Sequence, residues 1–125
     1  MTKMDDKKTG LAHFLAASSY SWAGFRRLLG ESAFRHELLL AFVVLAALIV
    51  FGVPAGDIVI SAVLFLALFG VEALNTAIEE IIDRISPEVS VTGRHAKDLG
   101  SFAVFCLILA SCLYSGFALV RALFA

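Results

Sequence analysis

Three long apolar blocks limit what this chain can fold into. They cover residues 33–53, 58–82 and 99–120 of a 125-residue sequence that is 60% hydrophobic. The hydrocarbon core of a bilayer is about 30 Å thick and takes about 20 helical residues to cross, so each block is long enough for one transmembrane helix. Soluble domains carry only about 45–50% apolar residues. We therefore expect an all-α membrane protein that forms a single domain over residues 1–125.

The segment before the first block, residues 10–30, has a different pattern. Its apolar residues recur near helical spacing and share one face, whereas its polar and basic residues fall mostly elsewhere. This pattern is typical of an amphipathic helix lying in the membrane surface, with Tyr20 and Trp22 at headgroup level. A plain membrane anchor is the alternative.

The basic residues predict the orientation of the chain. Nine of the ten lie before or at the start of the first block or between the second and third: Lys3, Lys7, Lys8, Arg26, Arg27, Arg35, Arg84, Arg94 and Lys97. Only Arg121 follows the third block. The positive-inside rule then places the N-terminus and the second loop in the cytoplasm, and the "GVPAGD" turn and C-terminus outside. The net charge of -1 argues against a nucleic-acid partner.

The second block ends in acids, in the stretch "FGVEALNTAIEEIIDRIS". At 100° per residue, Glu72, Glu79 and Asp83 fall within about 20° of one direction, and Asn75 lies about 60° to one side. Counted from Ile58, Glu72 lies about 21 Å along the helix and still near hydrocarbon. An ionisable group near the centre of a membrane costs about 2.5–3.5 kcal/mol and is by default a functional candidate.

Carboxylates stacked on one stripe repel each other unless a cation or a shared proton lies among them. Magnesium takes one or two protein carboxylates and fills its other positions with water and phosphate oxygens, so a nucleotide is a natural companion. Glu31, before the first block, could supply a ligand from another helix. An interhelical polar network without chemistry, or a proton or cation path, remains an alternative.

A second polar cluster, "GRHAKDLGS", lies on the same predicted side of the membrane. We expect Lys97 and Asp98 to open the third helix, with Ser101 one turn further in. A lysine and an arginine near a carboxylate-bound magnesium suit a polyphosphate, whose transfer depends on positioning and charge neutralisation. The alternative for Asp98 is a structural pairing with Lys97. By pattern alone, His13 and His95 are surface histidines.

Four stretches together resemble the prokaryotic diacylglycerol kinase family: "EALNTAIEEIIDRIS", "AKDLGS", "YSWAGFR" and "ESAFRHE", in the family's order. The resemblance covers residues 10–119. It implies a bacterial inner-membrane kinase with three transmembrane helices and an N-terminal surface helix. It also implies a homotrimeric bundle that uses Mg²⁺ and ATP to phosphorylate a lipid alcohol.

The resemblance further implies roles for individual residues. Glu72 matches the general base. Glu31 and Glu79 match metal ligands, and Asn75 and Asp83 match other polar active-site positions. The positions that match ATP contacts are His13, Tyr20, Glu31, Glu79, Glu88, Lys97 and Asp98. The positions that match lipid contacts are Ala17, Ser21, Trp22, Arg26, Phe34, Arg35, Glu37, Glu72 and Ser101. The chain departs from a relative at His13, where that relative has arginine, and in the loop "PEVSVTGRH".

The identity of the acceptor lipid is the most detailed of these expectations. "ESAFRHE" and "TGRHAKDLGS" look like the diacylglycerol branch, which gives phosphatidic acid, whereas "ISPE" also occurs in undecaprenol kinases.

An ion-conducting or structural membrane protein is the alternative of another class. We expect no lysine or aspartate in the external half of any span, which argues against a conduction path. Small residues four apart, Ser111 with Ser115 and Cys112 with Gly116, favour close helix approach between subunits.

Overall fold

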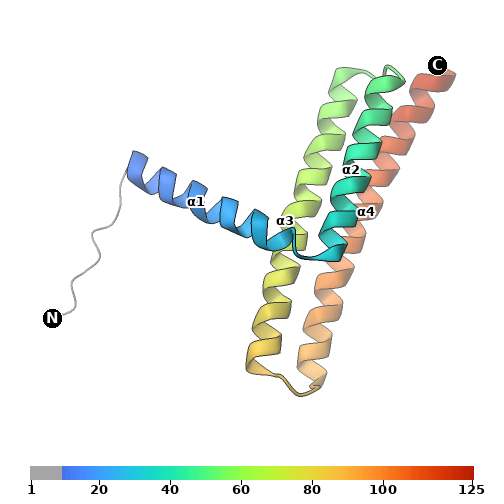
Figure 1. Ribbon diagram of the computed structural model, residues 1–125. Helices are drawn as coiled ribbons and strands as arrows, with labels where there is room; N and C mark the ends of the chain where they lie inside the picture. Colours follow the sequence, from blue (N-terminus) through green and yellow to red (C-terminus); the bar gives the residue numbers. More distant parts are fainter. Residues whose placement is uncertain (1–9) are drawn as a thin grey trace.

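The structure is a computed structural model that describes residues 10–125, so Lys3, Lys7 and Lys8 lie outside the described part. It contains four helices, α1 (Leu11–Leu28), α2 (Ser32–Val50), α3 (Ala55–Ile85) and α4 (Val91–Phe124) (Figure 1). By length and composition, α2, α3 and α4 are each able to cross a membrane. The expected all-helical class with three candidate spans is confirmed.

The turn between α2 and α3 is tighter than the apolar pattern indicated. α2 ends at Val50 rather than at residue 53, and α3 begins at Ala55 rather than at residue 58. Gly52 turns the chain with φ of 70°, a left-handed conformation that glycine adopts without strain. Pro54 then caps α3, where its fixed φ suits a helix start.

α4 begins at Val91, eight residues before the expected start, so Lys97 and Asp98 lie about two turns inside the helix and do not open it. Ser90 is the N-cap, and its hydroxyl accepts a hydrogen bond from the Gly93 backbone N–H at 3.0 Å. The apolar block marked only the part of the helix that can cross a membrane. The helix itself continues through polar residues to the nearest cap.

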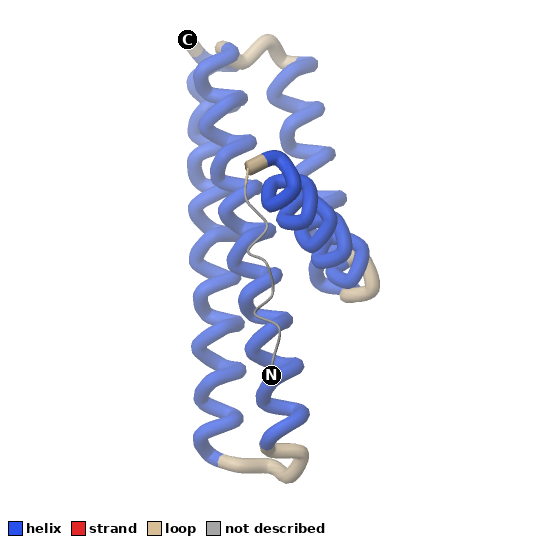
Figure 2. Tube along the Cα trace, turned by 90° about the vertical axis from the view of Figure 1, so that its left-hand side faces the viewer, coloured by secondary structure: helices blue, strands red, loops and turns tan. Residues whose placement is uncertain are grey.

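α3 and α4 run antiparallel and form a hairpin that extends well beyond the start of α2 (Figures 1 and 2). The 31 residues of α3 span roughly 46 Å, which exceeds the roughly 30 Å of a hydrocarbon core. Part of the hairpin must therefore project from a membrane that α3 crosses. α1 leaves the bundle sideways, near the level where α2 begins (Figure 1).

Small and apolar side chains hold the helices together. Ala41, Phe65, Leu68 and Val104 form a buried core between α2, α3 and α4. Nearer the chain's C-terminus, Ser115 of α4 donates a hydrogen bond to Ser61 of α3 at 3.0 Å.

Ser111 and Ser115 are both buried within this one chain, so the expectation that they serve subunit contact is wrong. They let α4 approach its own α3 instead. Cys112 and Gly116, the other small pair, are exposed.

The end of the bundle away from the hairpin loop contains a buried acid. Asp57 of α3 accepts a hydrogen bond from the Tyr114 hydroxyl at 2.6 Å and pairs with Arg121, both on α4. The Arg121 guanidinium also lies 5.2 Å from the centre of the Phe117 ring. The expectation of no aspartate in this half is wrong, because α3 starts before the apolar block. The acid is closed off by its partners and does not line an open path.

Candidate active site

Two carboxyls are buried on neighbouring helices, one on α2 and one on α3. Glu37 of α2 is 6% exposed and Glu72 of α3 is 5% exposed. Within residues 10–125, the Glu37 Oε2 atom has no hydrogen-bond partner. Buried polar atoms are almost always satisfied, and an exception often marks the place of a ligand, an ion or a water. This pair is therefore a candidate for chemistry and not a packing contact alone.

Asn75 lies one turn beyond Glu72 and is wedged against α4. A Cβ atom on Gly100 would come within 2.1 Å of the Asn75 Oδ1 atom, so only glycine allows this approach. The Asn75 amide donates to the Glu79 Oε1 atom at 3.4 Å, and its own Oδ1 atom has no partner among the described residues. The amide therefore holds the next acid of the stripe, Glu79, from a buried position one turn beyond Glu72.

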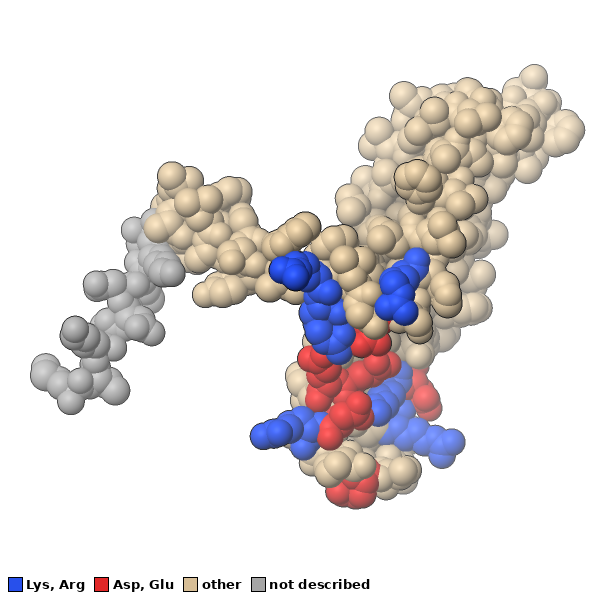
Figure 3. All heavy atoms as spheres, viewed as in Figure 1, with Lys and Arg blue, Asp and Glu red and all other residues tan. Residues whose placement is uncertain are grey.

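Exposure increases along the acidic stripe of α3. Glu72 is buried, Glu79 is half-buried, and the Asp83 side chain is 67% exposed. Figure 3 shows acidic and basic side chains gathered over the hairpin, whereas the opposite half of that face shows none. The stripe leads from the helix interior to a charged, accessible surface.

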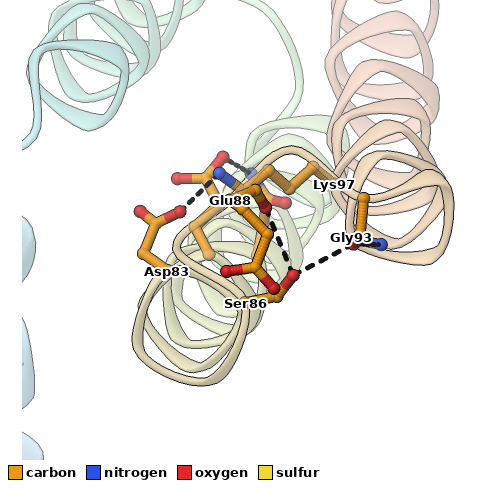
Figure 4. A network of polar contacts seen from close by, with 8 residues as sticks. Asp83, Ser86, Glu88, Gly93 and Lys97 are labelled. Atoms are coloured by element: carbon orange, nitrogen blue, oxygen red, sulfur yellow. Dashed lines mark hydrogen bonds and ion pairs between the residues drawn. The ribbon is translucent and has the colours of Figure 1, made fainter.

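The hairpin end carries a hollow of about 270 Å³ between the two helices and their loop. It brings together four of the residues that the sequence singled out, Asp83, Glu88, Lys97 and Asp98. The Lys97 Nζ atom lies 2.5 Å from Asp83 Oδ1 (Figure 4). A hollow that mixes an ammonium group with several acids can hold a metal-bound polyphosphate.

The loop beside this hollow is held by Ser86. Its hydroxyl bonds to the Glu88 carbonyl oxygen at 3.3 Å and to the Ser90 hydroxyl at 3.0 Å (Figure 4). Ser90 in turn caps α4 through Gly93. The loop "SPEVS" is therefore ordered from both sides, with Glu88 at the rim of the hollow.

Arg27, in the last turn of α1, joins two acids that belong to different elements. Its guanidinium donates to Glu31 at 2.9 Å and to Glu80 of α3 at 2.7 Å. These hydrogen bonds, first that of Glu31 and then that of Glu80, raise the pKa of Arg27 above its usual value. From the sequence, Arg27 is one of the basic residues that predict the cytoplasmic side, whereas Glu80 carries no predicted role.

The candidate metal ligands Glu31 and Glu79 belong to different elements, the N-cap of α2 and the acidic stripe of α3. Within residues 10–125, no three acidic, histidine or cysteine side chains form a metal-binding group, and no hydrogen bond or ion pair joins Glu31 to Glu79. Magnesium needs only one or two protein carboxylates, and both residues offer the hard oxygen donors that it prefers. The donor set therefore fits magnesium, with each residue contributing one carboxylate.

The predicted residues of α1 are not brought to Glu72 within this chain. His13, Ala17, Tyr20 and Trp22 are exposed on the helix that projects from the bundle (Figure 1). Of the other predicted lipid contacts, Arg26 and Ser101 are also exposed.

A groove of about 690 Å³ lies between α1, α2 and α3, lined mostly by apolar side chains. Ser21 and Phe34, both predicted lipid contacts, line it. Phe34 packs edge-on against Phe25 and Phe69, with ring centres 5.9 and 5.3 Å apart. Arg35 donates to the Leu29 carbonyl oxygen at 2.8 Å and so fixes the turn into α2.

Comparison with known proteins adds independent findings. Residues 19–119 match the family model described as prokaryotic diacylglycerol kinase. A diacylglycerol kinase of Sinorhizobium sp. is 50% identical over 115 residues, which cover 92% of this chain and 84% of that protein. A diacylglycerol kinase of Pseudomonas aeruginosa is 43% identical over 78% of this chain and 80% of its own length. That of Escherichia coli K12 is 38% identical, over 85% and 88%.

Proposed function

The chain belongs to the prokaryotic diacylglycerol kinase family, and from this premise we propose that it transfers the γ-phosphoryl group of ATP to diacylglycerol. The product is phosphatidic acid. The observation that carries the proposal is the acidic stripe of α3, which begins at the buried Glu72 and ends at the charged hollow beside Lys97.

Glu72 is the general base of the proposed reaction. Its carboxylate takes the proton of the lipid hydroxyl while the alcohol oxygen bonds to the γ-phosphorus, and the bond from that phosphorus to the bridging oxygen of ADP breaks. A base for a membrane-embedded alcohol must itself lie within the helix bundle, as Glu72 does. Glu37, buried on α2, contacts the acceptor lipid.

The nucleotide occupies the hairpin side of the site. Lys97 neutralises phosphate charge, while Asp98 and Glu88 contact the remainder of the nucleotide around the hollow. Glu31 and Glu79 would hold a magnesium ion, whose chemistry is to neutralise the charge on the transferring phosphoryl group. Asn75 keeps Glu79 directed along the stripe through its amide.

The lipid approaches from the side of α1. We infer that α1 lies in the membrane surface, with Trp22 and Tyr20 at headgroup level, and that acyl chains pass through the apolar groove beneath it. Arg26, Arg27, Arg84, Arg94 and Lys97 gather near α1 and the hairpin, which supports a cytoplasmic position for this side. The C-terminus then lies outside a bacterial inner membrane.

A homotrimer is part of the proposal. The α1 residues matched to ATP and lipid contacts project away from their own bundle, so a site that uses them together with Glu72 needs a neighbouring subunit (Figure 1). Exposed apolar side chains on every helix provide surface for such contact or for lipid.

The test is a transfer assay with purified protein in micelles, γ-labelled ATP and Mg²⁺. Diacylglycerol and undecaprenol are offered together at matched mole fraction, because "ISPE" also occurs in undecaprenol kinases. We expect labelled phosphatidic acid as the main product. A kcat/KM at least tenfold higher for undecaprenol corresponds to about 1.4 kcal/mol of extra transition-state stabilisation. That result would make undecaprenol the acceptor lipid in place of diacylglycerol. No labelled lipid at all would remove the kinase proposal and leave conduction or a structural role.

A further inference from the structure

One guanidinium is shared between two acids at the junction of α1, α2 and α3. The Arg27 Nε atom donates to the Glu80 Oε1 atom at 2.7 Å, and its Nη2 atom lies 2.5 Å from the same oxygen. Its Nη1 atom donates to the Glu31 Oε1 atom at 2.9 Å. Two nitrogens of the Arg27 guanidinium therefore converge on one Glu80 oxygen, which leaves Nη1 for Glu31.

Stability alone does not account for this arrangement. The Arg27 and Glu80 side chains are about half exposed, and solvent screens exposed ion pairs so that they contribute little to stability. α1 is attached to the bundle mainly through apolar contacts, with Leu28 buried and Phe25 against the Phe34 ring. The Arg27–Glu80 contact therefore matters more for the orientation it gives to the Glu31 side chain than for its energy.

The side chain whose direction is set is Glu31. It occupies the N-cap of α2 with extended backbone angles, but its carboxylate makes no capping hydrogen bond. Among the described residues, its only hydrogen-bond donor is Arg27. Gly30 leaves room for this geometry, because a Cβ atom there would lie 3.2 Å from the Arg27 carbonyl oxygen and 3.7 Å from Nη1.

We propose that Arg27 is a positioning residue, anchored by Glu80, that orients the Glu31 carboxylate toward the metal–nucleotide. The inference rests on the proposed function, in which Glu31 is a metal ligand. Carboxylates that bind metals are themselves held by hydrogen bonds, and loss of such a partner typically weakens metal binding about 10–100-fold. Glu80 has a second effect, because its charge balances that of Arg27 and so limits repulsion of the cation.

The test measures metal binding directly, without turnover. Mn²⁺ serves as the probe, and its binding to the protein in micelles with a non-hydrolysable ATP analogue is followed by electron paramagnetic resonance. Arg27→Gln and Glu80→Gln are compared with Glu31→Gln and with Arg84→Gln, an exposed charge change elsewhere on α3. We expect a Kd for Mn²⁺ about tenfold higher or more in the first three variants and an unchanged Kd in Arg84→Gln.

The double variant Arg27→Glu with Glu80→Arg separates orientation from simple tethering. It can restore an ion pair between α1 and α3 but places a carboxylate beside Glu31. We expect Mn²⁺ binding to remain weak, and recovery to the wild-type Kd would overturn the inference.

The Glu31→Gln variant distinguishes failure of the Arg27 positioning role from failure of the proposed kinase function. Weak Mn²⁺ binding in Glu31→Gln with normal binding in Arg27→Gln overturns the positioning role and leaves the proposed function standing. Normal binding in Glu31→Gln removes Glu31 as a ligand and overturns the positioning role with it.

Discussion

Lys97 of α4 and Asp83 of α3 form an ion pair of 2.5 Å that joins the two arms of the hairpin at the edge of the charged hollow. The pair is well exposed, so solvent screens it and it contributes little to stability. The Lys97 charge is placed to serve a bound phosphate as well as Asp83.

We therefore expect Lys97→Met to raise the KM for ATP at least tenfold while the midpoint of thermal unfolding changes little. Steady-state kinetics and a melting curve of the same preparation provide the measurement. A lowered melting temperature with an unchanged KM would make Lys97 a structural brace.

Gly100 tests the placement of Asn75. The methyl group of Gly100→Ala would overlap the Asn75 Oδ1 atom, so the amide must move away from Glu79 or α4 must shift. We expect kcat to fall at least tenfold, with the protein still folded. Gly56→Ala, where an added Cβ meets nothing within 4 Å, is the matched control and should keep its activity. Equal activity of the two variants would show that the position of Asn75 is immaterial.

Asp57 provides a prediction about stability without an effect on chemistry. Tyr114→Phe removes the 2.6 Å hydrogen bond to a buried carboxylate and should cost about 1–3 kcal/mol of unfolding free energy. The KM values for ATP and lipid should not change, since this cluster lies at the end of the bundle away from the hairpin loop. Denaturant unfolding in micelles measures the loss. An altered KM would mean that the two ends of the bundle are coupled.

Subunit sharing predicts complementation between inactive chains. If the base and the metal ligands of one site come from different subunits, mixing Glu72→Gln chains with Glu79→Gln chains should restore part of the activity, because some mixed trimers carry one intact site. The measurement is kcat after dissociation and reassembly at varied ratios. Each variant reassembled alone is the control. Well-mixed oligomers without recovery would place each site within one chain.

The sequence predicted the parts of this structure that depend on local periodicity. Hydropathy located α2, α3 and α4, and the 100° rotation per residue placed Glu72, Glu79 and Asp83 on one stripe of α3. Hydropathy could not give the start of α4, because the polar turns before residue 99 are set by the Ser90 cap and not by apolar pattern.

Contacts between segments far apart in the chain leave no local pattern in the sequence that would predict them. Glu80 lies 53 residues from Arg27, and nothing local indicates that they pair. The approach of α4 to Asn75 likewise depends on a glycine that resembles any other in the sequence. Ser111 and Ser115 had the spacing of a subunit contact, but tertiary packing used them within the chain.

The most direct test of the account is the rate of phosphoryl transfer to diacylglycerol by Glu72→Gln at saturating ATP and Mg²⁺. The amide has nearly the same shape as the carboxyl but cannot accept the proton of the lipid hydroxyl. General base catalysis is typically worth about 10²–10⁴-fold, so we expect kcat to fall by at least 100-fold while Mn²⁺ and nucleotide binding remain. A rate within a few-fold of wild type would contradict the assignment of Glu72 as the base.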